Sequence, residues 1–275
     1  MPEPLKRSLL TTAAFLLDMD GTVYLDGRLI DGVDSFIRFL EDRHITYLFL
    51  TNNSSRSAVD YATRLRSLGI PASTENILTS GDATAAYLQQ LMPGARLYVV
   101  GTPSLRDVFR THGFSLIYSR PDAVVLGFDT GLTYAKLRRL CDFVRQGLPF
   151  YATHPDINCP TLTGYMPDTG AMIAFVKAST GREPDLIIGK PNRYMVESAA
   201  AVLNIPMNSL AVVGDRLYTD IAMGKAANIP SVLVLSGETK LEDLALTPYE
   251  PDFVVKDLGK LSDYLQEVYE AAETP

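Results

Sequence analysis

Short apolar runs that alternate with amphipathic segments constrain the fold of this chain more than any other sequence feature. Near-continuous apolar runs occupy residues 15–17, 45–50, 186–188, 210–213, 231–235 and 253–255. Runs that are apolar on both faces are typical of parallel strands covered by helices on each side. Between them, apolar residues recur at helical spacing, as at Val33, Phe36 and Leu40. The sequence therefore predicts an α/β fold with a Rossmann-like parallel-sheet core.

The middle of the chain has its own set of strand and helix patterns. Residues 97–100, 123–126 and 150–152 read as strands, and Phe109 and Ile173 lie in helical stretches between or after them. We predict an inserted α/β domain over residues 80–182. The core domain is then discontinuous and comprises residues 1–79 and 183–275.

Charge and composition exclude several classes of partner. The chain has 275 residues and a formal net charge of −7, whereas binding to a nucleic-acid backbone needs clustered Lys and Arg. We expect no nucleic-acid partner. No apolar stretch reaches the ~20 residues that span a bilayer, so we expect no membrane partner.

Three residue groups bear on the cellular compartment. Lys6 and Arg7 precede the apolar run 9–17, which loosely resembles a signal peptide. That run lacks a small-residue cleavage site and passes directly into an acidic motif, so we predict a cytoplasmic protein. Cys141 and Cys159 are the only cysteines, which fits a reducing compartment.

Polar motifs follow four of the candidate core strands. They are Asp18-Met19-Asp20-Gly21-Thr22, Thr51-Asn52-Asn53, Gly189-Lys190-Pro191 and Gly214-Asp215 with Asp220 after it. Ligands of open α/β sheets bind outside the carboxyl ends of the strands, so we expect these motifs to converge on one site.

The residue types of these motifs suit phosphoryl transfer. Four acids face one lysine and one divalent ion, which leaves a charge of about −1. Oxygen ligands with room for water suit Mg²⁺. With the metal and Lys190 in place, a carboxylate can approach phosphorus as a nucleophile.

The motifs DMDGT, LTNN, the lysine of GKP and GDRLYTD resemble the four motifs of the haloacid dehalogenase superfamily. The middle segment resembles the cap domain of its NagD-like, or p-nitrophenylphosphatase-like, members. Residues 133–137, 151–156 and 189–192 support this resemblance, which covers nearly the whole chain.

The resemblance implies a role for each motif residue. Asp18 would be the nucleophile and a ligand of Mg²⁺, and Asp20 would be the general acid and base as well as a metal ligand through its backbone carbonyl. Asp215 would complete the metal site, with Asp220 in the surrounding shell. The phosphate would be bound by Thr51, Asn52, Asn53 and Lys190, and Lys190 would also neutralise Asp18. The substrate would be a small phosphorylated metabolite such as a sugar phosphate or nucleotide, and a homodimer would form through the cap.

Each residue also has a structural alternative. Asp18, Asp20 and Asp215 could be turn or N-cap residues, and Asp220 could be a helix-surface acid. The segment 51–53 could be a polar loop, and Lys190 a solvated lysine. Two interpretations stay open for three further residues. His154 and Asp156 could form a turn or face the active site, and Arg216 could contact the substrate or form an ion pair. We expect Asp168 to be the N-cap of a helix.

Other functions use parts of the same scaffold. Dehalogenation needs no leaving-group acid, so Asp20 argues against it. A phosphotransferase or mutase uses the same residues with another acceptor, and a non-catalytic phosphometabolite-binding module predicts that an essential group is missing. None is missing.

Overall fold

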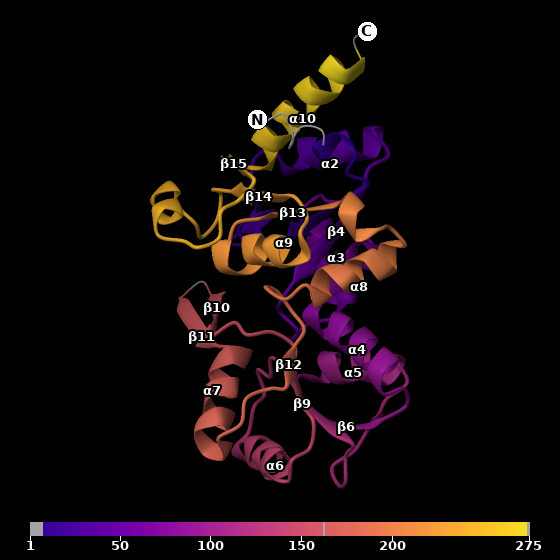
Figure 1. Cartoon of the computed structure of the whole chain (residues 1–275), viewed down its shortest axis with the longest axis vertical. Coiled ribbons are helices and arrows are strands. Elements are labelled where there is room, and N and C mark those ends of the chain that lie inside the picture. Colours follow the sequence, from indigo (N-terminus) through magenta and orange to yellow (C-terminus); the bar gives the residue numbers. More distant parts are fainter. Residues whose placement is uncertain (1–7, 162, 274–275) are drawn as a thin grey trace. The chain divides into compact units, whose positions relative to one another are not determined.

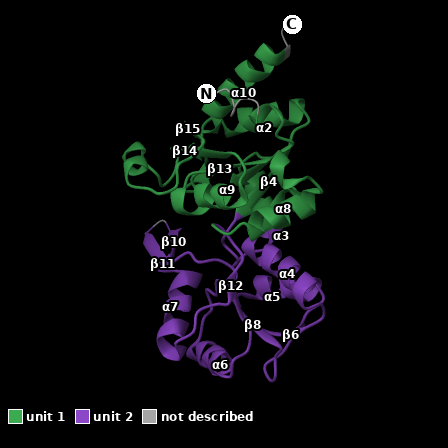
Figure 2. Ribbon diagram, viewed as in Figure 1, with its two compact units in different colours: residues 1–50, 61–78, 191–275 green, residues 51–60, 79–190 purple. Residues whose placement is uncertain are grey.

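The computed structural model describes residues 8–161 and 163–273, so the basic pair Lys6-Arg7 of the leader-like segment lies outside the described residues. The chain divides into two compact units, which are coloured separately in Figure 2. Unit 1 comprises residues 1–50, 61–78 and 191–275, and unit 2 comprises residues 51–60 and 79–190. Over the described residues, no helix is both long and apolar enough to cross a membrane.

Unit 1 is built on a six-stranded sheet with the order β15-β14-β13-β1-β4-β5. Its strands are β1 (Ala14–Asp18), β4 (Thr46–Thr51), β5 (Ile77–Thr79), β13 (Leu210–Gly214), β14 (Ser231–Val234) and β15 (Phe253–Val255). Helices α2 (Val33–Asp42) and α10 (Leu258–Glu273) lie on one side of the sheet in Figure 1, and α8 (Tyr194–Leu203) and α9 (Ala222–Ala227) lie on the other. Helices on both faces explain why the strands are apolar throughout.

Smaller elements complete this unit. A short hairpin, β2 (Tyr24–Leu25) and β3 (Arg28–Leu29), follows the first strand. Helix α3 (Ala58–Ser67) starts in the segment 51–60 and continues into unit 1. Short helical turns lie at Thr74–Asn76, Met207–Ser209, Leu217–Ile221 and Leu241–Ala245.

The central strand β1 is buried on both faces and pairs in parallel with two neighbours. Ala14 to Leu17 are fully buried. Leu17 is in register with Val213 of β13, and Asp18 is in register with Leu50 of β4. The carboxyl ends of these strands therefore lie at one edge of the sheet, where the first and fourth sequence motifs begin.

Unit 2 holds a five-stranded parallel sheet with the order β12-β9-β8-β6-β7. Its strands are β6 (Arg96–Val100), β7 (Ser115–Leu116), β8 (Ala123–Leu126), β9 (Phe150–Ala152) and β12 (Leu186–Ile187). An antiparallel hairpin consists of β10 (Asn158–Thr161) and β11 (Gly164–Pro167). The helices are α4 (Ser80–Leu91), α5 (Pro103–Thr111), α6 (Tyr134–Arg145) and α7 (Thr169–Thr180).

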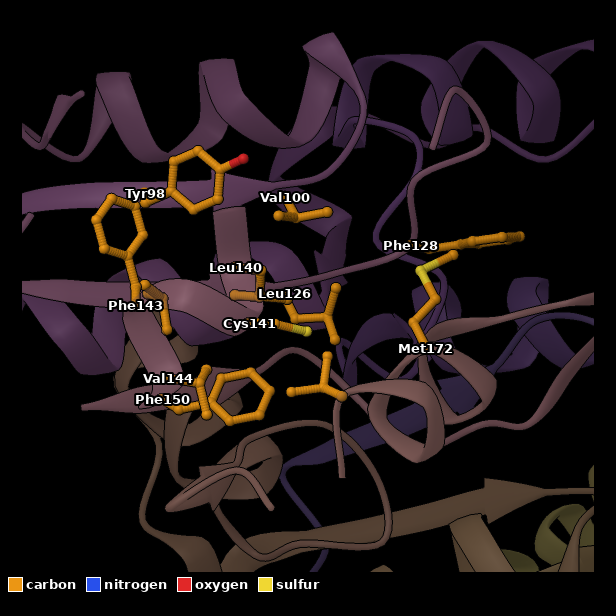
Figure 3. Packing of buried hydrophobic residues seen from close by; sticks show 12 residues of the cluster. Tyr98, Val100, Leu126, Phe128, Leu140, Cys141, Phe143, Val144, Phe150 and Met172 are labelled. Carbon is orange, nitrogen blue, oxygen red and sulfur yellow. The ribbon is translucent and has the colours of Figure 1, made fainter. Parts of the chain in front are cut away.

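Among the described residues of this unit, two hydrophobic clusters lie on the two faces of the sheet. Side chains of β6, β8 and β9 pack with α6 and α7, as Figure 3 shows for Tyr98, Leu126, Phe143, Phe150 and Met172. A second cluster joins alternate residues of the same strands to α4 and α5. The predicted strands at 97–100, 123–126 and 150–152 are thereby confirmed, as is the α/β fold class.

One sequence-based expectation about a strand was wrong. The run 186–188 was predicted to be a core strand, but β12 pairs with β9 of unit 2, with Leu186 opposite Tyr151. A short apolar run does not reveal which of two parallel sheets it joins. Before α9, residues Leu217–Ile221 form a π-helical turn, which places Asp220 in an irregular segment. The compact units depart from the predicted domain bounds chiefly at residues 51–60 and 183–190.

Gly32, at the start of α2, is a position where close packing demands glycine. Its φ is +84°, and a Cβ there would collide with the backbone of Gly259 in α10. Gly27, in the β2–β3 turn, has φ +76° but no atom within 4 Å of the Cβ position.

Gly27→Ala should therefore lower the free energy of unfolding by about 1–2 kcal/mol through backbone strain alone. Gly32→Ala should cost about 1–3 kcal/mol more through overpacking. Urea unfolding measures both, and equal losses would show that α2 and α10 do not depend on this contact.

Candidate active site

Three carboxylates gather at the carboxyl ends of β1 and β13 in unit 1. Ligand oxygens of Asp18, Asp215 and Asp220 all lie within 4.8 Å of one another. Among the described residues, no other group of three acidic, histidine or cysteine side chains meets this distance. Asp18 is partly exposed, whereas Asp215 and Asp220 are buried. The turn, N-cap and helix-surface alternatives do not account for three acids brought this close.

The π-helical turn Leu217–Ile221 carries Asp220 into this group. Oδ2 of Asp220 accepts hydrogen bonds from the backbone N–H of Arg216 at 3.2 Å and from Oγ1 of Thr219 at 3.3 Å. Asp215 is held separately, because the backbone N–H of Glu238 donates to its Oδ2 at 2.6 Å. Single π-helical turns occur frequently at functional sites.

Glycines leave the room that the buried carboxylates occupy. A Cβ at Gly21 or Gly237 would collide with Oδ2 of Asp215, and a Cβ at Gly214 would collide with the side chain of Asp220. Gly21 also has φ +91°, so the DMDGT loop depends on glycine for its backbone as well. Gly237 was not predicted from the sequence, since nothing in the local pattern shows that it packs against Asp215.

Like charges at this separation repel each other, and a bound cation would relieve the repulsion. Carboxylate oxygens are hard ligands of the kind that Mg²⁺ prefers. A neighbouring cation is supplied by Arg216, whose Nε lies 2.9 Å from Oε2 of Glu238. Burial by itself would lower the pKa of Arg216, but attraction to Asp18, with smaller contributions that include Glu238 and Asp215, raises it overall. The ion pair of Arg216 is thus present in the structure, and its contact with the substrate stays a prediction.

The Asp20 carboxylate does not belong to the group of three, and Tyr24 orients it. The Tyr24 hydroxyl donates to Oδ2 of Asp20 at 3.2 Å, and the guanidinium of Arg64 lies 4.2 Å from the centroid of the Tyr24 ring. Burial raises the pKa of Tyr24 well above its usual value, and the charge of Asp20 raises it further. Tyr24 therefore keeps its proton and remains a donor at neutral pH. Sequence reasoning missed Tyr24, although its spacing of four residues from Asp20 across a tight turn was visible.

The second motif belongs to unit 2 from Thr51 onward. Thr51 is the last residue of β4 and, like Asn52, is buried. Oγ1 of Thr51 accepts from the backbone N–H of Asn53 at 3.1 Å, and Oδ1 of Asn53 accepts from the backbone N–H of Ser55 at 2.9 Å. These local bonds shape a tight polar loop.

Lys190 is also in unit 2, and it is buried rather than solvated, with 3% of its surface exposed. The backbone N–H of Lys190 donates to Oδ1 of Asn52 at 2.8 Å, and Nδ2 of Asn52 donates to the Lys190 carbonyl at 2.9 Å. The structure thus brings the second and third motifs together in unit 2 and the first and fourth together in unit 1. The convergence of all four on one metal stays a prediction.

His154 and Asp168 have structural partners in unit 2. His154 is fully buried, and its Nε2 lies 2.9 Å from Oδ1 of Asp168. Asp168 is the N-cap of α7, as predicted, and accepts from the backbone N–H of Thr169. Asp156 is half-buried and accepts from Nδ2 of Asn52 at 2.9 Å.

Comparison with known proteins agrees with this geometry. Residues 15–115 match the family model of haloacid dehalogenase-like hydrolases, and residues 187–261 match the HAD-hydrolase-like model. The chain is 35% identical to the 5'-nucleotidase YutF of Bacillus subtilis over 255 residues, which cover 93% of this chain and 99% of that protein.

Solved structures give the same result. The crystal structure of a 4-nitrophenylphosphatase from Thermotoga maritima has a TM-score of 0.91 and 45% sequence identity, and the match covers 94% of this chain and 99% of that one. A glycerol phosphate phosphatase from Mycobacterium tuberculosis, solved in complex with calcium, has a TM-score of 0.85 and 33% identity, with 92% of this chain and 76% of that one covered. The chain therefore belongs to the haloacid dehalogenase-like hydrolases and is a phosphatase of the NagD type, a hydrolase of phosphoric monoesters.

Proposed function

We propose that the chain is a Mg²⁺-dependent phosphatase that hydrolyses small phosphate monoesters through an aspartyl-phosphate on Asp18. The observation that carries the proposal is the group formed by Asp18, Asp215 and Asp220, in which Asp18 alone is partly exposed. An exposed carboxylate can reach a substrate, whereas the two buried ones suit a structural task around a cation.

The proposed Mg²⁺ ligands are the carboxylates of Asp18 and Asp215 and the backbone carbonyl of Asp20, with Asp220 in the surrounding shell. When bound, Mg²⁺ would neutralise the carboxylates and polarise the phosphoryl oxygens. The residues fit this ion because they offer closely spaced oxygens and no sulfur or nitrogen. The calcium complex of the Mycobacterium tuberculosis relative supports a divalent ion in that protein.

Two aspartates, Asp18 and Asp20, carry out the covalent steps of the proposed hydrolysis. A carboxylate oxygen of Asp18 forms a bond to phosphorus while the bond from phosphorus to the ester oxygen breaks, and Asp20 gives its proton to the departing oxygen. Asp20 then takes a proton from water, which attacks the phosphorus of the aspartyl-phosphate and releases inorganic phosphate and free Asp18. Tyr24 donates a hydrogen bond to Oδ2 of Asp20 and so orients the carboxyl group that transfers this proton.

The phosphate group is held by the second and third motifs in this proposal. Thr51, the backbone of Asn52, and Asn53 would bind its oxygens, while Lys190 would neutralise Asp18 and the transferring group. The burial of Lys190 supports this role, because a buried ammonium group needs a negative partner.

The proposed substrate is a small phosphorylated metabolite, with p-nitrophenyl phosphate as a laboratory substitute. The similar proteins are named for a nucleotide, glycerol phosphate and 4-nitrophenyl phosphate, all phosphate monoesters. Residues 80–182 would form the substrate-selecting cap, and a homodimer through the cap and a cytoplasmic location remain part of the proposal. No observation favours the phosphotransferase, dehalogenase or binding-module alternatives.

Asp18→Asn should lower kcat for p-nitrophenyl phosphate by at least about 10³-fold, because an amide cannot act as the nucleophile. The matched control is Asp26→Asn, in the β2–β3 turn, where φ is +50° and asparagine is well tolerated. Circular dichroism checks that both variants are folded. An Asp18→Asn enzyme that keeps a tenth or more of its activity would rule out a covalent role for this residue.

Removal of divalent ions should abolish the activity of the enzyme without unfolding it. We expect EDTA to abolish turnover and added Mg²⁺ to restore it, because the grouped carboxylates otherwise repel the anionic substrate. The measurement is initial rate against free Mg²⁺ concentration. Full activity in excess EDTA would overturn the metal assignment.

Gly237→Ala tests whether packing around Asp215 tunes the metal site. The new methyl group would displace the Asp215 carboxylate, and changes around metal ligands typically weaken affinity by about 10–100-fold. The Mg²⁺ concentration for half-maximal activity should rise by that factor. Gly131→Ala is the control, since its nearest neighbour is an atom of Asp129 at 3.6 Å. An unchanged Mg²⁺ requirement in Gly237→Ala would show that Asp215 does not hold the ion.

A further inference from the structure

The side-chain amide of Asn52 holds the backbone of Lys190 in place. It accepts from the Lys190 N–H at 2.8 Å and donates to the Lys190 carbonyl at 2.9 Å. This is the two-bond pattern by which neighbouring strands pair, here made by a side chain. Both residues are buried, with 6% and 3% of their surfaces exposed, so water does not compete for these bonds.

The amide group of Asn52 has no further donor to offer a ligand. A primary amide has two N–H donors, and Nδ2 uses them on the Lys190 carbonyl and on Oδ1 of Asp156, each at 2.9 Å. An aspartate in this position would have the same shape but no donor, and it would place a second carboxylate against Asp156. The chemistry of the site therefore requires an amide.

Gly189 allows this approach of the backbone. A Cβ at Gly189 would lie 2.7 Å from Oδ1 of Asn52 and 2.6 Å from the carbonyl oxygen of Thr153. Any side chain there would push the backbone of the adjacent Lys190 away from the amide. The glycine of the GKP motif is thus explained by packing rather than by its φ angle.

A second set of buried hydrogen bonds anchors Asn52 itself. Oγ of Ser80 donates to the Asn52 carbonyl at 2.5 Å and lies 3.3 Å from Nδ1 of His154. His154 in turn contacts Oγ1 of Thr153 at 2.9 Å and Oδ1 of Asp168 at 2.9 Å. Fully hydrogen-bonded buried networks of this kind make a segment rigid.

We propose that the Asn52 side chain is a positioning residue that fixes the location of Lys190, while the backbone of the same residue serves the phosphate. This inference rests on the proposed function, in which Lys190 neutralises the transferring phosphoryl group. The side chain and the backbone of Asn52 then have different roles. The surrounding residues Ser80, His154 and Asp168 hold Asn52 in place.

The test is a double-mutant cycle on kcat and KM for p-nitrophenyl phosphate. Asn52→Ala should lower kcat about 10²-fold with a smaller change in KM, which is the loss expected when a charged group is misplaced by about 1 Å. In a Lys190→Met background the same substitution should cost nothing measurable, because there is no ammonium group left to position. Equal losses in both backgrounds would overturn the inference.

Two further variants separate positioning from general damage to the fold. Asn52→Asp keeps the size of the side chain but removes both donors, so it should lose at least as much kcat as Asn52→Ala and show the same dependence on Lys190. Asn76→Ala removes an asparagine that only completes a capping box in unit 1, and its kcat should match that of the wild type. Wild-type kcat in Asn52→Asp would contradict the inference.

The cycle also distinguishes the inference from the function on which it rests. A Lys190→Met enzyme with nearly wild-type activity would refute the proposed role of the lysine, and the positioning role with it. A Lys190→Met enzyme with strongly reduced but measurable kcat, in which Asn52→Ala causes the same fold loss as in the wild type, would refute the positioning role alone.

Discussion

Electrostatic repulsion among Asp18, Asp215 and Asp220 is the constraint on which the rest of the site depends. Their ligand oxygens lie within 4.8 Å of one another, two of the three side chains are buried, and such a group is unfavourable without a compensating cation. Much of the local structure serves to hold these acids in place: parallel pairing of β1 with β13, a π-helical turn, and glycines where a methyl group would not fit.

The two compact units carry different parts of the chemistry. Unit 1 holds the acids of the first and fourth motifs, together with Tyr24 and Arg216, which contact or influence them. Unit 2 holds the phosphate-loop residues and Lys190, and the Asn52 amide ties these two motifs to each other. The proposed mechanism needs both sets of residues. Catalysis therefore requires that each unit hold its own side chains in fixed positions.

Much of the fold and of the site could be predicted from the sequence, because the strands are apolar throughout and the polar motifs directly follow them. The order of elements and the proximity of Asp18 to Asp215 follow from that pattern. The NagD-like family was predicted from the resemblance of the motif residues, and the solved structures confirm it. Long-range packing could not be predicted. Nothing local shows that β12 joins the sheet of unit 2, that Gly237 contacts Asp215, or that the Asn52 amide pairs with the backbone of a residue 138 positions away. Tyr24 is an intermediate case, since its spacing from Asp20 was visible but its burial was not.

The central claim is that Asp18 becomes phosphorylated during turnover, and peptide mass spectrometry of acid-quenched enzyme tests it most directly. Enzyme mixed with excess substrate and Mg²⁺, quenched within one turnover and digested at low pH, should show one phosphoryl group on the peptide that contains Asp18. The group should disappear when the quench is delayed until the substrate is exhausted. A phosphoryl group on any other residue, or rapid turnover with no phosphorylated peptide under conditions that preserve acyl phosphates, would contradict the account.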